Sequence, residues 1–281
     1  MRDHATEKVV KTYNQMAQEH DSIVARVPFL MNCYLLYNKL IPKLTRGKRF
    51  QRVLDAGCGS GLQTIQLARC SEEVVGLDIA AGLIEVAQQR CAGLTNVSFV
   101  VESVTKMPFE DESFDAIFSY GDVVSHLLED YEKATAEFSR VAKRGALVSL
   151  EVDNKWNFGI FYHPRELWDA LKLRGRGHGS RIWKGMFFKT FTHHELRSLL
   201  KRYDLELLEY HGHNIFASLI PDRYALEEGE RSFLGWVALW LGRLDKTISG
   251  IFPFNRFGFN IVVVARKRLL VSDLANNYAK G

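Results

Sequence analysis

The chain has 281 residues, of which 47% are hydrophobic and 25% are charged. These values are ordinary for a globular protein and exclude a disordered or fibrous chain. Lysine and arginine outnumber aspartate and glutamate by only 37 to 33, an excess too small to predict nucleic-acid binding. The four cysteines form no C-x-x-C pair, which favours a reducing cytoplasm over a disulfide framework or a zinc site.

The amino terminus lacks the apolar stretch of a secretory signal. The most apolar stretch, Phe233 to Leu241, is much shorter than the roughly 20 residues that a spanning helix needs. We therefore expect a single domain over residues 1–281, located in the cytoplasm and without a transmembrane segment.

From about Arg52 onward, short β-branched runs alternate with helical patterns. The expected strands are Val53–Leu54, Val74–Leu77, Val97–Val101, Asp115–Ser119, Ala146–Val152, Glu206–Tyr210 and Asn260–Ala265. The expected helices are Leu62–Cys70, Ala81–Arg90, Tyr131–Lys143 and a last one that runs to about Tyr203, opened by the capping-box spacing of Thr192 and Glu195. This order predicts a doubly wound, Rossmann-like α/β fold with about seven strands in a mostly parallel sheet.

Three further segments frame this core. Residues 1–45 are expected to form a helical lid, and residues 156–190 and 218–258 are expected to be cap insertions after the fifth and sixth strands. The second insertion is unusually apolar between residues 233 and 257. Packing on the core would explain this pattern, and so would an acceptor pocket or a peripheral contact with a membrane surface.

The turn after the first strand has the pattern Asp55-x-Gly57-x-Gly59-x-Gly61. Glycines allow a sharp turn and a close approach of the backbone to a ligand. A dinucleotide fingerprint has the spacing G-x-G-x-x-G, and here the third glycine comes one residue early. Asp55 would repel a pyrophosphate but attract an ammonium group. Asp78 ends the next strand 21 residues beyond Gly57, about the separation at which an acid meets ribose hydroxyls. These residues favour S-adenosylmethionine, which carries an ammonium and no phosphate, over NAD.

In these residues the sequence resembles the class I S-adenosylmethionine-dependent methyltransferases, with Val53 to Gly61 as the glycine motif and Asp78 as the ribose-binding acid. The resemblance extends over roughly residues 10 to 155, and includes the segment 107–119 and an E-x-x-R-V helix at Glu137 to Val141. Within this family, the sequence is similar to the branch that includes quinone-biosynthesis and small-molecule methyltransferases. The cofactor-binding residues that the resemblance implies are Tyr13, Asp55, Gly57, Cys58, Gly59, Gly61, Asp78, Ile79, Ser103, Val104 and Ser119.

The sequence departs from the family's pattern in three places. Ser103 stands where many relatives have an aspartate that receives the adenine amino group, and Arg144-Gly145-Ala146 replaces a P-G-G turn. Residues 13–21 resemble an element that closes over the cofactor, with His20 in place of its second tyrosine. From this resemblance we expect Tyr13 to cover the methionine part of the cofactor.

Residues that handle the acceptor are expected in the loop after the fourth strand, at the carboxyl edge of the sheet. His126 is a candidate general base because the unperturbed pKa of histidine lies near neutrality, or it packs under the following helix. Tyr120 is the second catalytic candidate, and it either lines the pocket or packs in the core. Glu151 and Asp153, at the end of the fifth strand, could orient an acceptor or accept a proton, or lie in a solvated turn.

Other motifs are less specific. The basic, glycine-rich loop 174–181 binds an anionic group of the substrate or is a surface loop. Aromatic residues are sparse beside it, so a small molecule is favoured over RNA or DNA as the substrate. The histidine pairs at 193–194 and at 211 and 213 lack accompanying carboxylate or cysteine ligands, and we expect no metal.

The sequence thus predicts an enzyme that transfers a methyl group from S-adenosylmethionine to a small, partly apolar or lipid-like acceptor. The acceptor, the methylated atom and the oligomeric state stay open. Two alternatives are a non-catalytic cofactor- or partner-binding protein with the same fold, and an NAD-dependent oxidoreductase.

Overall fold

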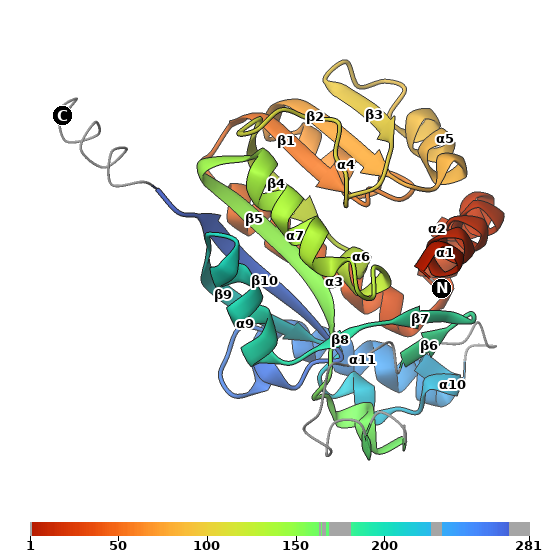
Figure 1. Ribbon diagram of the computed structural model, residues 1–281. Helices are drawn as coiled ribbons and strands as arrows, with labels where there is room; N and C mark the ends of the chain where they lie inside the picture. Colours follow the sequence, from red (N-terminus) through yellow and green to blue (C-terminus); the bar gives the residue numbers. More distant parts are fainter. Residues whose placement is uncertain (1, 163, 165–166, 169–180, 226–231, 270–281) are drawn as a thin grey trace.

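A computed structural model describes residues 2–162, 164, 167–168, 181–225 and 232–269. Its central sheet has the strand order β3-β2-β1-β4-β5-β10-β9, with β8 added beside β5 (Figure 1). The strands of this sheet are β1 Phe50–Ala56, β2 Ser71–Asp78, β3 Val97–Val101, β4 Phe114–Ser119, β5 Ala142–Asn154, β8 Thr190–Phe191, β9 Leu205–His213 and β10 Asn260–Lys267. The hairpin of β6 Arg181–Trp183 and β7 Met186–Phe188 stands apart from it.

The directions of the strands confirm the predicted mostly parallel, Rossmann-like sheet. Strands β3, β2, β1, β4 and β5 pair in parallel, whereas β10 pairs antiparallel with both β5 and β9. Parallel strands need crossovers, and the helices of these crossovers cover the two faces of the sheet. All seven strands expected from the sequence are present, and β8 is an addition to them.

The helices lie on both faces of the sheet, so neighbouring residues of a strand face different layers. Val53 packs among residues of α3, whereas the adjacent Leu54 packs among residues of α7 and α9. Both side chains are fully buried. The α-helices are α1 Arg2–Met16, α2 His20–Arg26, α3 Pro28–Thr45, α4 Thr64–Ala68, α5 Ala81–Arg90, α6 Val123–His126, α7 Tyr131–Val141, α9 His193–Arg202, α10 Asp222–Ala225 and α11 Phe233–Ile248. Short 3-10 helices are η1 Ala17–Glu19, η2 Phe158–Tyr162, η3 Ala217–Leu219 and η4 Phe254–Arg256.

The amino-terminal residues form helices, as expected. Helix α1 lies between α5 and the β6–β7 hairpin (Figure 1). The side-chain oxygen of Asn14 accepts a hydrogen bond from the backbone N–H of Gly82 at 2.8 Å, which joins α1 to the start of α5. This contact places α1 beside the carboxyl ends of the first strands.

The bounds of several elements differ from their predictions, and for two of them the difference has a visible local cause. Helix α4 begins at Thr64 rather than Leu62, because the chain is still turning after Gly61. Strand β5 begins at Ala142, four residues early, and its register with β4 shifts where Gly145 adopts a φ of 81°. The predicted capping box of α9 is confirmed, since Thr192 and Glu195 exchange side-chain to backbone hydrogen bonds.

The two predicted cap segments carry different structures. Residues 156–190 include η2 and the β6–β7 hairpin, and most of the basic loop 174–181 lies outside the described residues, with Arg181 its only described member. Residues 218–258 include α10, α11 and η4. Helix α11 packs on α3, where an added side-chain carbon at Gly242 would overlap Asn32.

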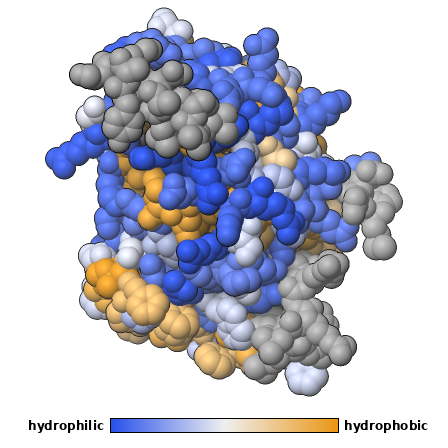
Figure 2. All heavy atoms as spheres, turned by 60° about the vertical axis from the view of Figure 1, so that its left-hand side comes forward, coloured by the Kyte–Doolittle hydropathy of each residue, from blue (hydrophilic) through white to orange (hydrophobic). Residues whose placement is uncertain are grey.

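The other face of α11 is exposed and apolar. It presents Phe233, Trp236, Trp240 and Leu244, spaced by three or four residues, and the exposed Phe252 follows nearby in the chain. Figure 2 shows apolar side chains gathered at the lower end of the molecule, the end where α11 lies in Figure 1. Among the described residues, none of the helices combines the length and the apolar character needed to cross a bilayer.

Candidate active site

A cavity of about 600 Å³ lies at the carboxyl ends of β1, β2, β4 and β5. This volume is typical of a small-molecule site, and the sheet edge is where doubly wound folds bind ligands. Ten of the predicted site residues line the cavity: Tyr13, Gly57, Cys58, Gly59, Asp78, Ile79, Ser103, Val104, Tyr120 and His126.

The glycine turn forms one wall of the cavity with its backbone. Gly57 and Gly59 have φ angles of 78° and 53°, which glycine adopts without strain. A side-chain carbon at Gly57 would lie 2.2 Å from Cγ2 of Val123, so the turn sits directly against the start of α6. The absence of side chains here leaves the backbone open to a ligand.

Asp78 closes β2 beside this turn. Its carboxylate accepts hydrogen bonds from the backbone N–H groups of Gly59 and Ala80, both at 2.9 Å. Burial raises the pKa of Asp78, and these N–H groups oppose that rise. Each carboxylate oxygen retains acceptor capacity, which suits Asp78 to the ribose hydroxyls that the resemblance assigns to it.

Ser103 and Val104 line the cavity next to Glu102, which sequence reasoning missed. The hydroxyl of Ser103 lies 2.8 Å from the hydroxyl of Thr105, and its backbone N–H donates to the Glu102 carboxylate at 2.8 Å. A carboxylate therefore does stand at this end of the cavity, one residue before the position at which relatives carry theirs. Its place directly after β3 was the available signal.

Three predicted cofactor residues lie behind the cavity wall rather than on it. Asp55 is buried and accepts a hydrogen bond from the Thr64 hydroxyl at 2.6 Å, and burial raises its pKa to about 7. Gly61 packs against Ala87 of α5, where a side-chain carbon would lie 3.1 Å away. Ser119 is fully buried. These residues shape the turn from beneath.

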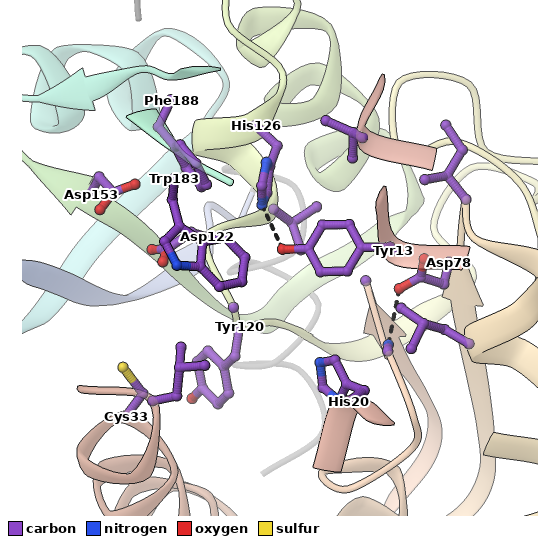
Figure 3. Close-up of a pocket in the computed structure, with 18 of the residues that line it drawn as sticks. Tyr13, His20, Cys33, Asp78, Tyr120, Asp122, His126, Asp153, Trp183 and Phe188 are labelled. Carbon is purple, nitrogen blue, oxygen red and sulfur yellow. Dashed lines mark hydrogen bonds between the residues drawn. The ribbon is translucent and has the colours of Figure 1, made fainter. Parts of the chain in front are cut away.

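Tyr13 and His126 meet across the cavity (Figure 3). The Tyr13 hydroxyl lies 2.9 Å from Nε2 of His126, which joins the amino-terminal helix α1 to α6. Burial lowers the pKa of His126 to about 4, so its ring is neutral at physiological pH and is a weak base. Its other nitrogen, Nδ1, is buried and has no hydrogen-bond partner within the described residues.

Tyr120 faces the cavity with its ring and not with its hydroxyl. The hydroxyl lies 2.8 Å from that of Ser149, and the ring stacks on Tyr37 with centroids 4.6 Å apart. Glu151, beneath this pair, accepts hydrogen bonds from the Tyr37 hydroxyl and from the backbone N–H of Gly121 at 2.6 Å. This geometry favours a packing role for Tyr120.

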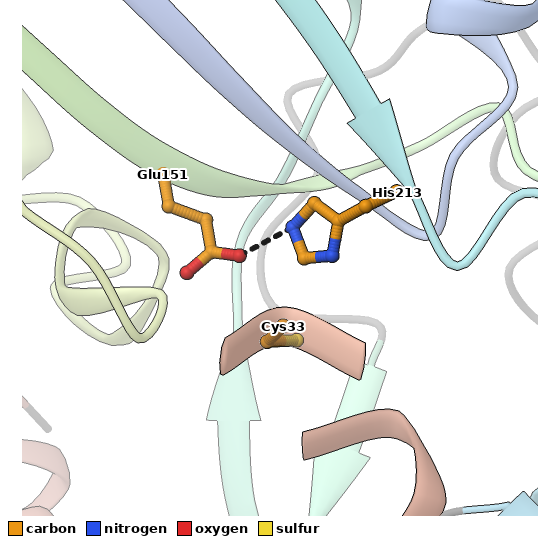
Figure 4. A group of neighbouring side chains, drawn as sticks. All are labelled: Cys33, Glu151 and His213. Carbon is orange, nitrogen blue, oxygen red and sulfur yellow. Dashed lines mark hydrogen bonds and ion pairs between the residues drawn. The ribbon is translucent and has the colours of Figure 1, made fainter. Parts of the chain in front are cut away.

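Glu151 also belongs to a group that could hold a metal ion. Cys33, Glu151 and His213 are buried, and one donor atom from each lies within 4.8 Å of the others (Figure 4). Nε2 of His213 already lies 2.5 Å from the Glu151 carboxylate, and burial raises the pKa of the Cys33 thiol well above its usual range. Hydrogen bonds therefore satisfy the carboxylate without an ion. The expectation that no metal is needed stays a prediction.

The far wall of the cavity is acidic and was only partly foreseen. Asp122 and Asp153 line it, and the side-chain amide of Asn260 donates to Asp122 at 2.9 and 3.0 Å and to Asp153 at 3.4 Å. The guanidinium of Arg181 donates to Asp153 at 2.5 Å. Sequence reasoning singled out Asp153 by its place at a strand end and placed Asp122 in the loop expected to face the acceptor, but it gave Asp122 no role of its own and did not indicate Asn260 or the pairing of Arg181 with Asp153.

The charges that line the cavity identify the kind of ligand it suits. Four carboxylates line it, those of Asp78, Glu102, Asp122 and Asp153, against one guanidinium, that of Arg181, among the residues that the structure describes. Such a site attracts a cation and repels a pyrophosphate. The bare glycine backbone, the Asp78 carboxylate and the apolar wall of Leu83 and Val104 fit S-adenosylmethionine, with its sulfonium, ammonium, hydroxyls and adenine.

Comparisons with known proteins agree with this fit. Residues 53–145 match a family model described as "Methyltransferase domain". The chain is 28% identical over 146 residues to a demethylmenaquinone methyltransferase of Staphylococcus aureus (strain MRSA252), and this match covers 50% of the chain and 58% of that protein. The chain thus spans somewhat more than half the length of this relative.

Two solved structures share the fold. The (4+2)-cyclase SpnF superposes with a TM-score of 0.64 at 17% identity, covering 93% of this chain and 96% of that one. An S-adenosylmethionine-dependent methyltransferase from Methanosarcina mazei superposes with a TM-score of 0.55 at 22% identity, covering 82% of this chain and 98% of that one. The matched family model over residues 53–145, the curated relative and this shared fold support the resemblance to class I S-adenosylmethionine-dependent methyltransferases, with similarity to the quinone-biosynthesis branch.

Proposed function

We propose that the protein transfers a methyl group from S-adenosylmethionine to a small, partly apolar acceptor. The observation that carries this proposal is the cavity itself, in which a bare glycine turn and four carboxylates face a single guanidinium among the described residues. Methyl transfer from a sulfonium is a displacement, so the protein's task is to align donor and acceptor in a pocket that excludes water.

The residues of the glycine side would hold the donor. In this proposal the backbone of Gly57 and Gly59 lies along the methionine part, Asp78 accepts from the ribose hydroxyls, and Ser103 and Val104 meet the adenine. Bound S-adenosylmethionine would supply the methyl group. Tyr13, held by His126, would cover the methionine part from the opposite side, as its position on the cavity wall allows.

His126 would then act by position more than by basicity. Its low pKa makes it a weak proton acceptor, while its hydrogen bond to Tyr13 fixes the wall between the donor side and the acceptor side (Figure 3). The ring of Phe188 lies 4.2 Å from that of His126, centroid to centroid, and continues the wall.

We further propose that the exposed face of α11 contacts a membrane surface, from which a lipophilic acceptor could be collected. Trp236 and Trp240 are more than half exposed, at 62% and 54%, and tryptophan favours the membrane interface. The exposed Arg243 on the same helix and Arg256 beyond it would face anionic head groups.

Calorimetric titration with S-adenosylhomocysteine and with NADH tests the central proposal. We expect micromolar binding of S-adenosylhomocysteine and no measurable binding of NADH, because the acidic cavity repels a pyrophosphate. Preference for NADH would instead indicate an oxidoreductase. Tight binding of S-adenosylmethionine without methyl transfer to any acceptor in a screen of amines, phenols and quinols would favour a binding protein.

A further inference from the structure

The two carboxylates of the far wall stand opposite the side that would hold the donor. Figure 3 shows Asp122 and Asp153 on the side of Trp183 and Phe188, and Asp78 on the other side, with Tyr13 and His126 between them. Asp153 is buried at 2% exposure, whereas Asp122 keeps part of its surface open inside the cavity. Asp122 is therefore the carboxylate that a second ligand would touch.

The backbone conformation of Asp122 accounts for its position at the cavity wall. It precedes α6 with a φ of 59°, in the left-handed region that is uncommon outside glycine. An aspartate at this position usually caps its helix, but the Asp122 side chain makes no capping hydrogen bond and turns to Asn260 instead. The next residue, Val123, lies directly against Gly57, so Asp122 stands beside the donor turn.

Among the described residues, the Asp122 carboxylate has no cationic partner. Arg181 pairs with Asp153, and no lysine or arginine forms an ion pair with Asp122 within the described ranges. Burial, followed by the neighbouring carboxylates of Asp153 and Glu151, raises the pKa of Asp122 well above its usual range.

Aromatic rings complete the surroundings of Asp122. Trp183, Phe188 and Tyr13 line the cavity around it, and the faces of such rings attract a cation. A phenolate or enolate would bring a further negative charge beside Asp122 and Asp153, which like-charge repulsion disfavours. An ammonium would neutralise that charge.

We propose that the cavity takes an acceptor that carries a primary or secondary amine on an apolar body, with Asp122 as the residue that binds the amine and receives its proton. This inference rests on the proposed function and names its substrate class. Asp153, fixed by Arg181 and Asn260, would set the negative potential and position the Asn260 amide against Asp122.

The step balances in atoms and charge. The ammonium of the acceptor gives one proton to the Asp122 carboxylate, which leaves a neutral amine and a carboxylic acid. The amine lone pair then forms the N–C bond while the C–S bond of the donor breaks, and that electron pair stays on sulfur. The products would be a methylated ammonium and the neutral sulfide S-adenosylhomocysteine, so the summed charge of the acceptor, the sulfonium and Asp122 is +1 before and after each step.

A pair of ligands tests this inference without knowledge of the acceptor. Sinefungin carries a protonated amine where S-adenosylmethionine carries its methyl group, whereas S-adenosylhomocysteine carries nothing there. If Asp122 faces this position, sinefungin should bind at least about tenfold more tightly than S-adenosylhomocysteine, the gain expected of a charge-assisted hydrogen bond. Calorimetry on the full chain measures both affinities.

Two variants distinguish the effect of the Asp122 carboxylate on sinefungin binding from a general effect of negative charge. Asp122→Asn should reduce the advantage of sinefungin to about twofold or less and leave the affinity for S-adenosylhomocysteine nearly unchanged, which also shows that the variant is folded. Glu110→Gln removes one exposed carboxylate outside the cavity and should keep the full advantage. Equal affinities in the wild type, or an advantage that survives in Asp122→Asn, would overturn the inference. Failure of S-adenosylhomocysteine to bind the wild type would overturn the proposed function instead.

Discussion

Gly57 combines a left-handed backbone conformation with tight packing against the start of α6. Gly57→Ala would require an alanine at a φ of 78° with its Cβ 2.2 Å from Val123, so we expect a loss of about 2 to 5 kcal/mol in the free energy of unfolding. Urea unfolding measures the change. Adding Val123→Ala should recover part of it, because only the overlap is relieved.

The control for this variant is Gly93→Ala. Gly93 has no atom within 4 Å of its would-be Cβ and no positive φ, so this change should be nearly neutral. If Gly57→Ala were as well tolerated as Gly93→Ala, the close approach of the turn to α6 would be wrong.

His126 should make stability depend on pH in a defined window. Burial lowers its pKa to about 4 from the ordinary 6.5, so the unfolded chain binds the proton more tightly than the folded one. The contribution of this residue is complete above pH 6.5 and is lost as the pH falls towards 4. The free energy of unfolding should therefore fall more steeply over this range in the wild type than in His126→Gln, as urea titrations at several pH values would show. Parallel curves would mean that His126 titrates normally.

At the residue scale, sequence reasoning found most of the residues on the glycine side of the cavity and few of those on its far wall. Gly57, Gly59 and Asp78 occupy fixed offsets along one β-turn-α-β segment, so local spacing was sufficient to find them. Asp122 and Asn260 are 138 residues apart and meet only through the antiparallel pairing of β10 with β5. No local sequence pattern predicts a contact between residues so far apart in the chain.

At the scale of elements, the feature to test is the hydrogen bond that joins Tyr13 of α1 to His126 of α6. Tyr13→Phe removes the hydroxyl that meets His126, so α1 should close less firmly over the cavity, and the affinity for S-adenosylhomocysteine should fall about threefold to tenfold. Calorimetry gives the affinity, and hydrogen exchange of the α1 amides reports the closure.

Tyr203→Phe is the matched control for that change. The Tyr203 hydroxyl lies 3.5 Å from Glu132, outside the cavity, so its removal should leave the affinity unchanged. Unchanged affinity in Tyr13→Phe as well would remove the support for Tyr13 as a cover of the methionine part.

The elements of the core could be predicted because each one carries a periodic signal of its own. Helix α5 lies at Ala81–Arg90 and strand β3 at Val97–Val101, as expected, and Thr192 caps α9. The β6–β7 hairpin was missed because its strands have only three residues each, too few to show alternation. The place of this hairpin beside α1 depends on contacts that lie far apart in the sequence.

At the scale of the whole molecule, the exposed face of α11 is the most unusual surface. If it contacts a membrane, the protein should sediment with vesicles of phosphatidylcholine and phosphatidylglycerol. The double variant Trp236→Ser with Trp240→Ser should bind at least about fivefold less, since two interfacial aromatic side chains are lost.

Val101→Ser provides the control for this experiment. Val101 is 51% exposed on β3, which lies at the opposite end of the molecule from α11 (Figure 1). Its substitution should leave vesicle binding unchanged. Absence of the wild-type protein from the vesicle pellet would rule out the membrane contact and leave the patch for another partner.

The two sides of the cavity come largely from different parts of the chain. Gly57, Gly59 and Asp78 of the glycine side lie within residues 53–145, the matched family region. Of the far wall, Asp122 also lies in that region, whereas Asp153, Arg181 and Asn260 lie beyond it. On the proposed function, substitutions around Asp153, Arg181 and Asn260 would change the surroundings of Asp122 while the glycine side of the cavity stays unchanged. An exchange of the segments around these three residues between relatives would alter this wall of the cavity without changing the glycine turn.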